Sequence, residues 1–256
     1  MLFRSLISRP RSTFTARICL SQIHVVSKIR NKGYRVSAAR YSTQTMPPTV
    51  ALRLMPLGGS VTYGVGSSDG NGYRKVLQEL LLANGYEVYM VGSRKAGSMR
   101  NNENEGWRGY RLDQIDGKAR RSVTTVKPNL FTINAGSNDC IQNHELDAFR
   151  ERMDNLLEYL WMTSPLSTII LSTLLVNADE QVNSRILDMN SHLRDLATLK
   201  EAERKKIVLA DMYCTEGPAL DDLIDGTHPN DDGYIKMAHI WFDAIQKAQA
   251  SIFVHP

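Results

Sequence analysis

The residues that could carry out acyl transfer lie in four short glycine-containing motifs spread along the chain. These motifs are Gly58-Gly59-Ser60, Gly106-Trp107-Arg108-Gly109, Gly136-Ser137-Asn138-Asp139 and Asp225-Gly226-Thr227-His228. A serine hydroxyl is a weak nucleophile near neutral pH and needs an adjacent base. His228 could accept the proton of Ser60, while Asp225 orients the imidazole and stabilises the imidazolium. We therefore predict that Ser60, Asp225 and His228 form a catalytic set.

Acyl transfer also needs hydrogen-bond donors for the oxyanion of the tetrahedral intermediate. Losing one such donor typically costs about 2.7–4 kcal/mol of transition-state stabilisation. The candidate donors are the backbone N–H groups of Ser60 and Gly109 and the side-chain amide of Asn138. We expect these three groups to form an oxyanion hole.

Three aromatic residues stand close in sequence to the predicted nucleophile and oxyanion glycine. Tyr63 follows Ser60, and Trp107 and Tyr110 flank Gly109. Their rings could stack on sugar rings of a substrate, or they could simply pack against neighbouring side chains. They are the candidates for substrate contact.

Each motif by itself has an ordinary structural explanation. A lone Ser60 is often a helix cap, and Asn138 and Asp139 favour turns and caps. Gly109 could be a loop glycine with positive φ, and His228 and Asp225 could be surface residues. The functional interpretation depends on the order of the motifs and on their positions relative to the predicted strands.

The elements expected to position the motifs alternate between strand and helix. Short apolar runs predict five strands, at residues 50–57, 86–93, 129–136, 167–175 and 206–213. Apolar residues at helical spacing predict five helices, over residues 73–81, 112–119, 146–160, 182–196 and 235–245. Strands this apolar are typical of a parallel sheet that is buried on both faces. We expect one three-layer α/β/α domain, with all four motifs at the edge formed by the carboxyl ends of the strands.

The charge is distributed unevenly along the chain, which has 256 residues and a net charge of +4. Residues 1–45 contain nine basic residues, and no acidic residue precedes Asp69. The remainder has 22 basic and 27 acidic residues, a net charge of −5. The basic balance therefore belongs to the leader, and we expect no nucleic-acid partner for the domain.

The N-terminal segment has the composition of a mitochondrial transit peptide, since it is rich in Arg and Ser and free of acids. We expect residues 1–48 to be a disordered or cleaved leader and residues 49–256 to be the folded domain. Alternatively, the start codon of this sequence lies upstream of the true one, and the protein would then be secreted or cytoplasmic. No run approaches the ~18 apolar residues of a membrane span, so we predict no transmembrane segment.

The three cysteines, Cys19, Cys140 and Cys214, show neither a disulfide framework nor metal-ligand spacing. A single bridge between Cys140 and Cys214 is conceivable, but we expect two reduced thiols. No residue pattern indicates a metal or cofactor, and we expect a monomer.

Taken together, the motifs GGS, GWRG, GSND and DGTH resemble the signature of the SGNH (GDSL-type) hydrolases. The resemblance extends from about residue 52 to residue 246 and is strongest to the acetylxylan-esterase branch, carbohydrate esterase family 3. It implies a flavodoxin-like sandwich with strand order 2-1-3-4-5 and no cofactor. It also implies Ser60 as nucleophile, Gly109 and Asn138 as oxyanion donors, and Asp225 and His228 as the rest of the triad. The substrates implied are small-molecule or carbohydrate esters, with lysophospholipids and acyl-thioesters as the alternative.

One position departs from this family pattern. The family normally has Asp between the glycine and the serine of the first motif, where this chain has Gly59. The resemblance implies that the missing Asp braces the loop without being a triad member. A loosely held site loses rate, so a non-catalytic binding module on a degenerate esterase scaffold remains an alternative.

A nucleotide-binding α/β domain is the third hypothesis, because GGSVTYGVG is glycine-rich and follows a strand. The segment lacks both the Lys-Ser/Thr ending of a P-loop and the GxGxxG spacing. The ester hydrolase is therefore the preferred hypothesis.

Overall fold

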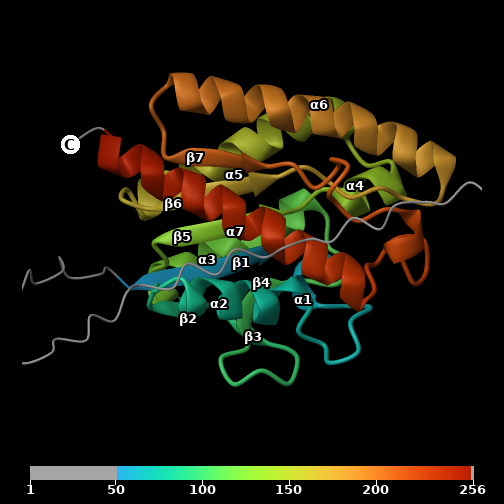
Figure 1. The fold of residues 1–256 in the computed structure, drawn as a ribbon. Helices are drawn as coiled ribbons and strands as arrows, with labels where there is room; N and C mark the ends of the chain where they lie inside the picture. The colour runs from blue at the N-terminus through green and yellow to red at the C-terminus, as the bar shows by residue number, and fades with distance from the viewer. Residues whose placement is uncertain (1–50, 255–256) are drawn as a thin grey trace, which may run out of the picture. The chain divides into compact units, whose positions relative to one another are not determined.

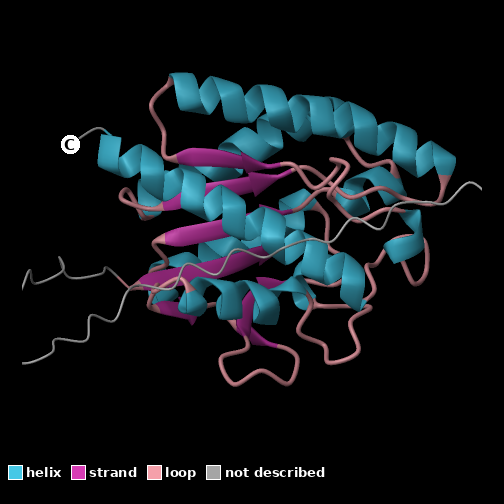
Figure 2. Cartoon of the chain, viewed as in Figure 1, coloured by secondary structure: helices cyan, strands magenta, loops and turns pink. Residues whose placement is uncertain are grey.

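A mostly parallel β-sheet forms the central layer of the computed structural model, which describes residues 51–254 (Figures 1 and 2). The five predicted strands are all present: β1 (Leu52–Gly58), β2 (Val88–Met90), β5 (Leu130–Asn134), β6 (Thr168–Ser172) and β7 (Ile207–Ala210). They pair in parallel in the order β2-β1-β5-β6-β7. The predicted α/β class and the strand order 2-1-3-4-5 are confirmed. The predicted leader, residues 1–48, lies outside the described residues.

Two short strands that the sequence did not predict extend the sheet to seven strands. β4 (Glu103–Gly106) runs parallel to the end of β1, and β3 (Arg94–Lys95) pairs antiparallel with β4. The segment ENEG has no apolar run, so hydrophobic periodicity could not reveal it. Gly106, the first residue of the second motif, is the last residue of β4 and pairs with Gly58 of β1.

Five long helices cover the two faces of the sheet. They are α2 (Tyr73–Ala83), α3 (Leu112–Val126), α5 (Phe149–Thr163), α6 (Glu180–Ala202) and α7 (Asp231–Val254). The predicted helix over residues 146–160 begins with a short 3₁₀ turn, η1 (Leu146–Ala148), before α5. A second 3₁₀ turn, η2 (Leu220–Asp222), precedes α7. Among residues 51–254, no helix has the length and apolar character needed to cross a bilayer.

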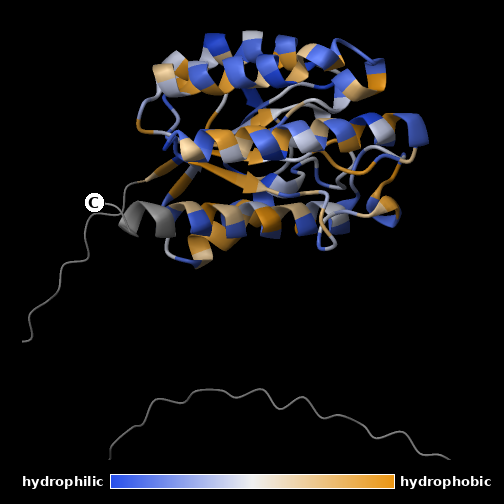
Figure 3. Cartoon of the chain, turned by 90° about the horizontal axis from the view of Figure 1, so that it is seen from above, coloured by the Kyte–Doolittle hydropathy of each residue, from blue (hydrophilic) through white to orange (hydrophobic). Residues whose placement is uncertain are grey.

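The alternation of side chains along each strand divides the core into two clusters. Leu54 contributes to the cluster beneath α2 and α7, whereas Met55 contributes to the cluster beneath α3, α5 and α6. On β6, Ile170 belongs to the first cluster and Ile169 and Leu171 to the second. Successive side chains of a strand point to opposite faces, so an all-apolar strand fills both clusters. Figure 3 shows the resulting arrangement, with strands coloured hydrophobic between helices that carry both kinds of residue.

Two short helices begin where strands end, on the side to which the parallel strands run (Figure 1). α1 (Ser60–Tyr63) follows β1, and α4 (Ser137–Gln142) follows β5. The first, second and third motifs of the sequence analysis therefore follow β1, β4 and β5 at one edge of the sheet. This is the edge at which ligands bind in open α/β sheets.

A buried arginine on α2 holds the loops beside this edge. Arg74 is completely buried, and its guanidinium donates hydrogen bonds of 3.0–3.2 Å to the carbonyl oxygens of Tyr63, Gly70, Ala96 and Asn102. Tyr63 ends the helix that begins with Ser60, so this cation fixes the far end of α1. The guanidinium thus satisfies carbonyl groups at the end of α1, in the loop between α1 and α2 and in the loop between β3 and β4.

We predict that Arg74→Met lowers the free energy of unfolding by roughly 2–4 kcal/mol, because the buried carbonyl groups would lose their donors. The change is measured as the shift in urea denaturation of the folded protein. Lys75→Met is the matched control, since Lys75 is exposed and makes one surface ion pair with Asp69 at 3.5 Å. Such a pair contributes about 0–1 kcal/mol. Equal destabilisation by the two variants would contradict the role assigned to Arg74.

Candidate active site

Ser60, His228 and Asp225 form a continuous chain of hydrogen bonds at the carboxyl edge of the sheet. The Oγ of Ser60 is 2.8 Å from Nε2 of His228, and Nδ1 of His228 is 2.7 Å from Oδ2 of Asp225. An ionised carboxylate can only accept, so Nδ1 carries the hydrogen and Nε2 is left to accept from Ser60. The structure thus brings together three residues that the sequence analysis grouped, although Ser60 and His228 are 168 positions apart.

The loop that carries Asp225 and His228 is held by its own backbone. Oδ1 of Asp225 accepts hydrogen bonds from the N–H groups of Thr227 at 3.0 Å and His228 at 2.8 Å. Partial burial alone would raise the pKa of Asp225, but the hydrogen bonds from His228 and Thr227 outweigh burial and lower it. Asp225 is therefore kept ionised, which suits a carboxylate that orients an imidazole.

The same loop is anchored to its surroundings at both ends. Within the loop, the N–H of Ile224 donates to the carbonyl of His228 at 2.9 Å. From outside, the N–H of Ala178 donates to the carbonyl of Gly226, also at 2.9 Å. On α7, the hydroxyl of Tyr234 donates to carbonyl oxygens at both ends of the turn after Ser60, those of Val61 and Val65. Through Tyr234, α7, which follows the loop of His228, is coupled to the segment that holds Ser60.

The candidate oxyanion donors come from three segments: Ser60 begins α1, Gly109 lies in the loop between β4 and α3, and Asn138 is the second residue of α4. One N–H of the Asn138 amide donates to the carbonyl of Tyr110 at 3.0 Å, which orients the amide and leaves its second N–H available. A methyl group added at Gly59 would lie 3.5 Å from Nδ2 of Asn138, so this amide is next to the residue that precedes Ser60. Gly109 has a φ of +76°, a conformation that favours glycine. The N–H groups of Ser60 and Gly109 donate to no group within residues 51–254.

Asp139 supports the oxyanion loops, a role that the sequence analysis did not assign. It is fully buried on α4, where Oδ2 accepts the first N–H of α3, from Leu112, at 2.9 Å. Oδ1 accepts from Arg152 of α5 at 2.8 Å. Burial raises the pKa of Asp139, while the hydrogen bonds from Leu112 and Arg152 oppose that rise. Nothing in the spacing of Asp139 and Arg152 indicates that they meet.

The three aromatic candidates gather at one side of this region. The rings of Trp107 and Tyr110 have centroids 5.3 Å apart. The indole N–H of Trp107 donates to Oε1 of the buried Glu105 at 2.9 Å. Arg94 lies 4.3 Å from the centroid of Trp107 and 5.2 Å from that of Tyr63. The rings are therefore already in contact with cations and are not bare stacking surfaces.

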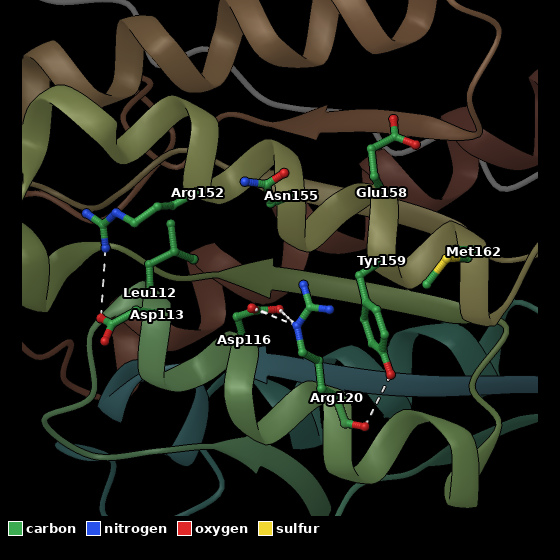
Figure 4. Close-up of a pocket in the computed structure, with 9 residues that line it drawn as sticks. All are labelled: Leu112, Asp113, Asp116, Arg120, Arg152, Asn155, Glu158, Tyr159 and Met162. Carbon is green, nitrogen blue, oxygen red and sulfur yellow. Dashed lines mark hydrogen bonds and ion pairs between the residues drawn. The ribbon is translucent and has the colours of Figure 1, made fainter.

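A separate groove of about 680 Å³ lies between α3 and α5 (Figure 4). Its charged side chains neutralise one another: Arg120 pairs with Asp116 at 2.9 Å, and Arg152 lies 3.8 Å from Asp113. Neither Ser60 nor His228 lines it. This groove is therefore not part of the chain of hydrogen bonds described above.

Within the part of the chain that the structure describes, no cluster of three or more His, Cys, Asp or Glu residues could hold a metal ion. Cys140 and Cys214 are free thiols, as predicted. Burial raises the pKa of Cys140 to about 12, so this thiol is an inert core residue.

Comparison with known proteins identifies the family. A model described as the GDSL-like lipase/acylhydrolase family matches residues 57–235. The chain belongs to this family of esterases and acylhydrolases. The match runs from the end of β1 into α7 and includes all four motifs, so the predicted SGNH (GDSL-type) family is confirmed.

Several carbohydrate and other esterases are similar to this chain. A multidomain esterase of Ruminococcus flavefaciens is 30% identical over 224 residues, covering 76% of this chain and 28% of its own length. The chain therefore spans little more than a quarter of that relative. A family 3 carbohydrate esterase of Clostridium thermocellum superposes with a TM-score of 0.70 at 25% identity, covering 78% of this chain and 98% of its own. A family 3 carbohydrate esterase of Talaromyces cellulolyticus shares the fold, with a TM-score of 0.68, 20% identity, and coverage of 78% and 99%.

The position where the family carries Asp can accept a side chain in this structure. Gly59 has a φ of −90°, which any L-residue adopts, and an added Cβ would make only an ordinary 3.5 Å contact with Asn138. Gly58 differs, because its Cβ would lie 2.1 Å from the carbonyl oxygen of Asn134. The two adjacent glycines therefore have different structural roles.

We predict that Gly59→Asp leaves esterase activity equal or higher, by adding hydrogen bonds to the loop before Ser60. Gly58→Ala is the contrasting variant, and it should lower kcat/KM by on the order of 10²-fold because it displaces α1 from the strand ends. Both are measured with p-nitrophenyl acetate, beside a thermal unfolding curve that checks folding. A large loss of activity in folded Gly59→Asp protein would show that this loop has a geometry of its own.

Proposed function

We propose that this protein is a serine ester hydrolase that works through an acyl-enzyme intermediate on Ser60. The observation that carries the proposal is the hydrogen-bonded chain from Ser60 through His228 to Asp225. Its position at the edge of the sheet where ligands bind, and the membership of the esterase and acylhydrolase family, support the same conclusion.

In the acylation step, Oγ of Ser60 attacks the ester carbonyl carbon while Nε2 of His228 takes the hydroxyl proton. The negative charge that forms on the carbonyl oxygen is stabilised by the N–H groups of Ser60 and Gly109 and by the free N–H of Asn138. The bond to the leaving oxygen then breaks, and His228 delivers its proton to the alcohol. The acyl group remains on Ser60.

In the deacylation step, His228 accepts a proton from water, and the hydroxide that forms attacks the acyl-enzyme carbonyl. The same donors hold the second oxyanion. Collapse of this intermediate returns the proton to Oγ of Ser60 and releases the carboxylic acid. Asp225 stays ionised throughout and stabilises each imidazolium that forms.

For the substrate, we propose small acyl esters, and in particular O-acetyl groups of carbohydrates. The similarity to two family 3 carbohydrate esterases supports an acetyl group on a sugar. Lysophospholipids and acyl-thioesters are the competing substrates, and a mitochondrial location, also proposed, would favour them over xylan. We also propose that the protein acts as a monomer and requires no cofactor.

We predict that the wild-type protein hydrolyses p-nitrophenyl acetate fastest in a series of p-nitrophenyl esters of increasing acyl length. Ser60→Ala should lose at least about 10³-fold of this activity and should not be labelled by a fluorophosphonate. Acetylated xylo-oligosaccharide, assayed in parallel, tests whether the enzyme accepts a sugar as the alcohol part of the ester.

The outcomes separate the candidate functions. A maximum at medium or long acyl chains would point to lipid or thioester substrates. No turnover and no label in wild-type protein, with Ser60→Ala behaving identically, would favour the non-catalytic binding module.

We predict that log kcat/KM, plotted against pH, rises with a slope of one on the acid side of the profile. Partial burial would raise the pKa of Asp225, but the hydrogen bonds from His228 and Thr227 lower it below its ordinary value. This carboxylate therefore stays ionised across the acid side of the profile. Activity requires a free Nε2 to accept the proton of Ser60, and Asp225 adds no second ionisation to the rise of activity with pH. A slope approaching two, measured with p-nitrophenyl acetate after subtraction of the Ser60→Ala blank, would show that Asp225 titrates in the same range.

A further inference from the structure

Several cations near the candidate nucleophile lie against aromatic rings and have no carboxylate partner. We define the cationic platform as Arg94, Arg108 and Lys118 with the rings of Tyr63 and Trp107. Arg94 lies against both rings, Arg108 is 6.0 Å from the centroid of Tyr63, and Lys118 is 4.0 Å from that of Trp107. Within residues 51–254, none of the three cations makes an ion pair.

The cationic platform borders the site through the backbone. Tyr63 belongs to α1, the four-residue helix that begins with Ser60. The N–H of Trp107 donates to the carbonyl of Gly58 at 2.9 Å, two residues before Ser60. Gly109, a candidate oxyanion donor, follows Trp107 by two residues. A substrate ester held at Ser60 therefore has the cationic platform beside it.

The carboxylates of the neighbouring segments are all engaged elsewhere. Glu103 pairs with Lys95 at 3.2 Å, and Asp116 pairs with Arg120. Asp113 lies 3.4 Å from Arg111. Glu105 is fully buried, and its oxygens accept hydrogen bonds from Ser93 and from the indole of Trp107. None of these carboxylates forms an ion pair with Arg94, Arg108 or Lys118, so the positive charge is in excess.

The excess positive charge continues beyond Trp107. A cavity of about 350 Å³ is lined by Trp107, Lys118 and Arg121, with Glu105 at its wall. Arg121 is exposed and makes no ion pair with described residues. The groove between α3 and α5 is different, because each of its bases lies near an acid. Unpaired positive charge therefore extends from the cationic platform to this cavity.

Stacked arginines are suited to holding an anion. A guanidinium that lies against an aromatic ring keeps its N–H groups free at the edge, where they can bind both oxygens of a carboxylate or phosphate. Because stacking fixes the side chain in advance, the side chain loses less conformational entropy when a ligand binds. Arg94 is half-buried between two rings and so is already fixed in place before a ligand arrives.

We propose that the ester substrate carries an anionic substituent, a carboxylate or a phosphate, which Arg94 and Arg108 bind on the cationic platform while Ser60 attacks the ester. This inference rests on the proposed function and specifies its substrate class. Arg94 and Arg108 are then specificity-determining residues, and Tyr63 and Trp107 hold them in position.

The test compares three aryl acetates that share one acyl group: 4-acetoxybenzoate, 4-acetoxyphenyl phosphate and the neutral methyl 4-acetoxybenzoate. For each ester, kcat/KM of Arg94→Gln is divided by that of the wild type, so differences in leaving-group reactivity cancel. We expect a loss of roughly tenfold to a hundredfold for the anionic esters and of no more than about threefold for the neutral one. The ester with the greater loss identifies whether carboxylate or phosphate is the better fit.

Two further measurements sharpen the comparison. Lys206→Gln also removes one exposed positive charge, but Lys206 precedes β7 at the opposite end of the strands, so all three ratios should stay near one. Raising the ionic strength should slow the anionic esters and leave the neutral ester unaffected, because salt screens the attraction. An equal loss on all three esters in Arg94→Gln would overturn the inference, since Arg94 would then only hold the rings. The inference would also be overturned if kcat/KM of Arg94→Gln, divided by that of the wild type, stayed near one for all three esters.

A binding measurement separates failure of the inference from failure of the proposed function. If the wild-type protein hydrolyses none of the three esters, the proposed function fails, and the cationic platform is tested with 4-hydroxybenzoate and inorganic phosphate as ligands. Tryptophan fluorescence reports their binding, because Trp107 is one of three tryptophans in the chain. Binding to the wild type that weakens at least tenfold in Arg94→Gln, and not in Lys206→Gln, would support the anion site. Absence of binding to the wild type would overturn it.

Discussion

The close approach of α1 to the ends of β1 and β4 is the constraint on which the rest of the site depends. A Cβ at Gly58 would clash with Oγ1 of Thr62 in α1 and with the carbonyl oxygen of Asn134 in β5. A Cβ at Gly106 would lie 2.5 Å from the backbone nitrogen of Tyr63 in α1. Because these two positions lack side chains, α1 packs directly on the strand ends. Ser60 therefore emerges at the sheet edge, within 2.8 Å of His228, which comes from the opposite end of the domain sequence.

Two buried charged side chains, Asp139 and Arg74, hold the loops around Ser60 by hydrogen bonds to different kinds of partner. Asp139 is matched by Arg152 and by the first N–H of α3, so a charge pair and a helix terminus together compensate its burial. Arg74 is matched by backbone carbonyls alone. In both cases a charged group bonds to segments that are distant in sequence, which gives the loops the rigidity that catalytic geometry requires.

The proposed anion site would give the proposed esterase a selectivity of its own. The hydrogen-bonded chain of Ser60, His228 and Asp225 would by itself serve many esters. In our proposal, Arg94 and Arg108 would add a preference that this chain cannot supply, because they would favour a substrate with negative charge near the reacting carbonyl. Gly59 is a separate feature of the site. Its backbone conformation and the free space around it would accommodate the family's Asp, but the loop forms without that Asp.

The sequence by itself determined the parallel sheet, its five main strands and the residues of the hydrogen-bonded chain. Apolar runs and helical spacing are local signals, and motifs that follow parallel strands must meet at one edge of the sheet. Only the tertiary structure decided the positions of β3 and β4, the contact of Asp139 with Arg152 and the stacking of Arg94 on Tyr63 and Trp107. β4 is a polar segment that becomes a strand because β1 offers it a free edge. The other contacts join side chains from separate elements, and such pairings depend on three-dimensional packing that no local pattern encodes.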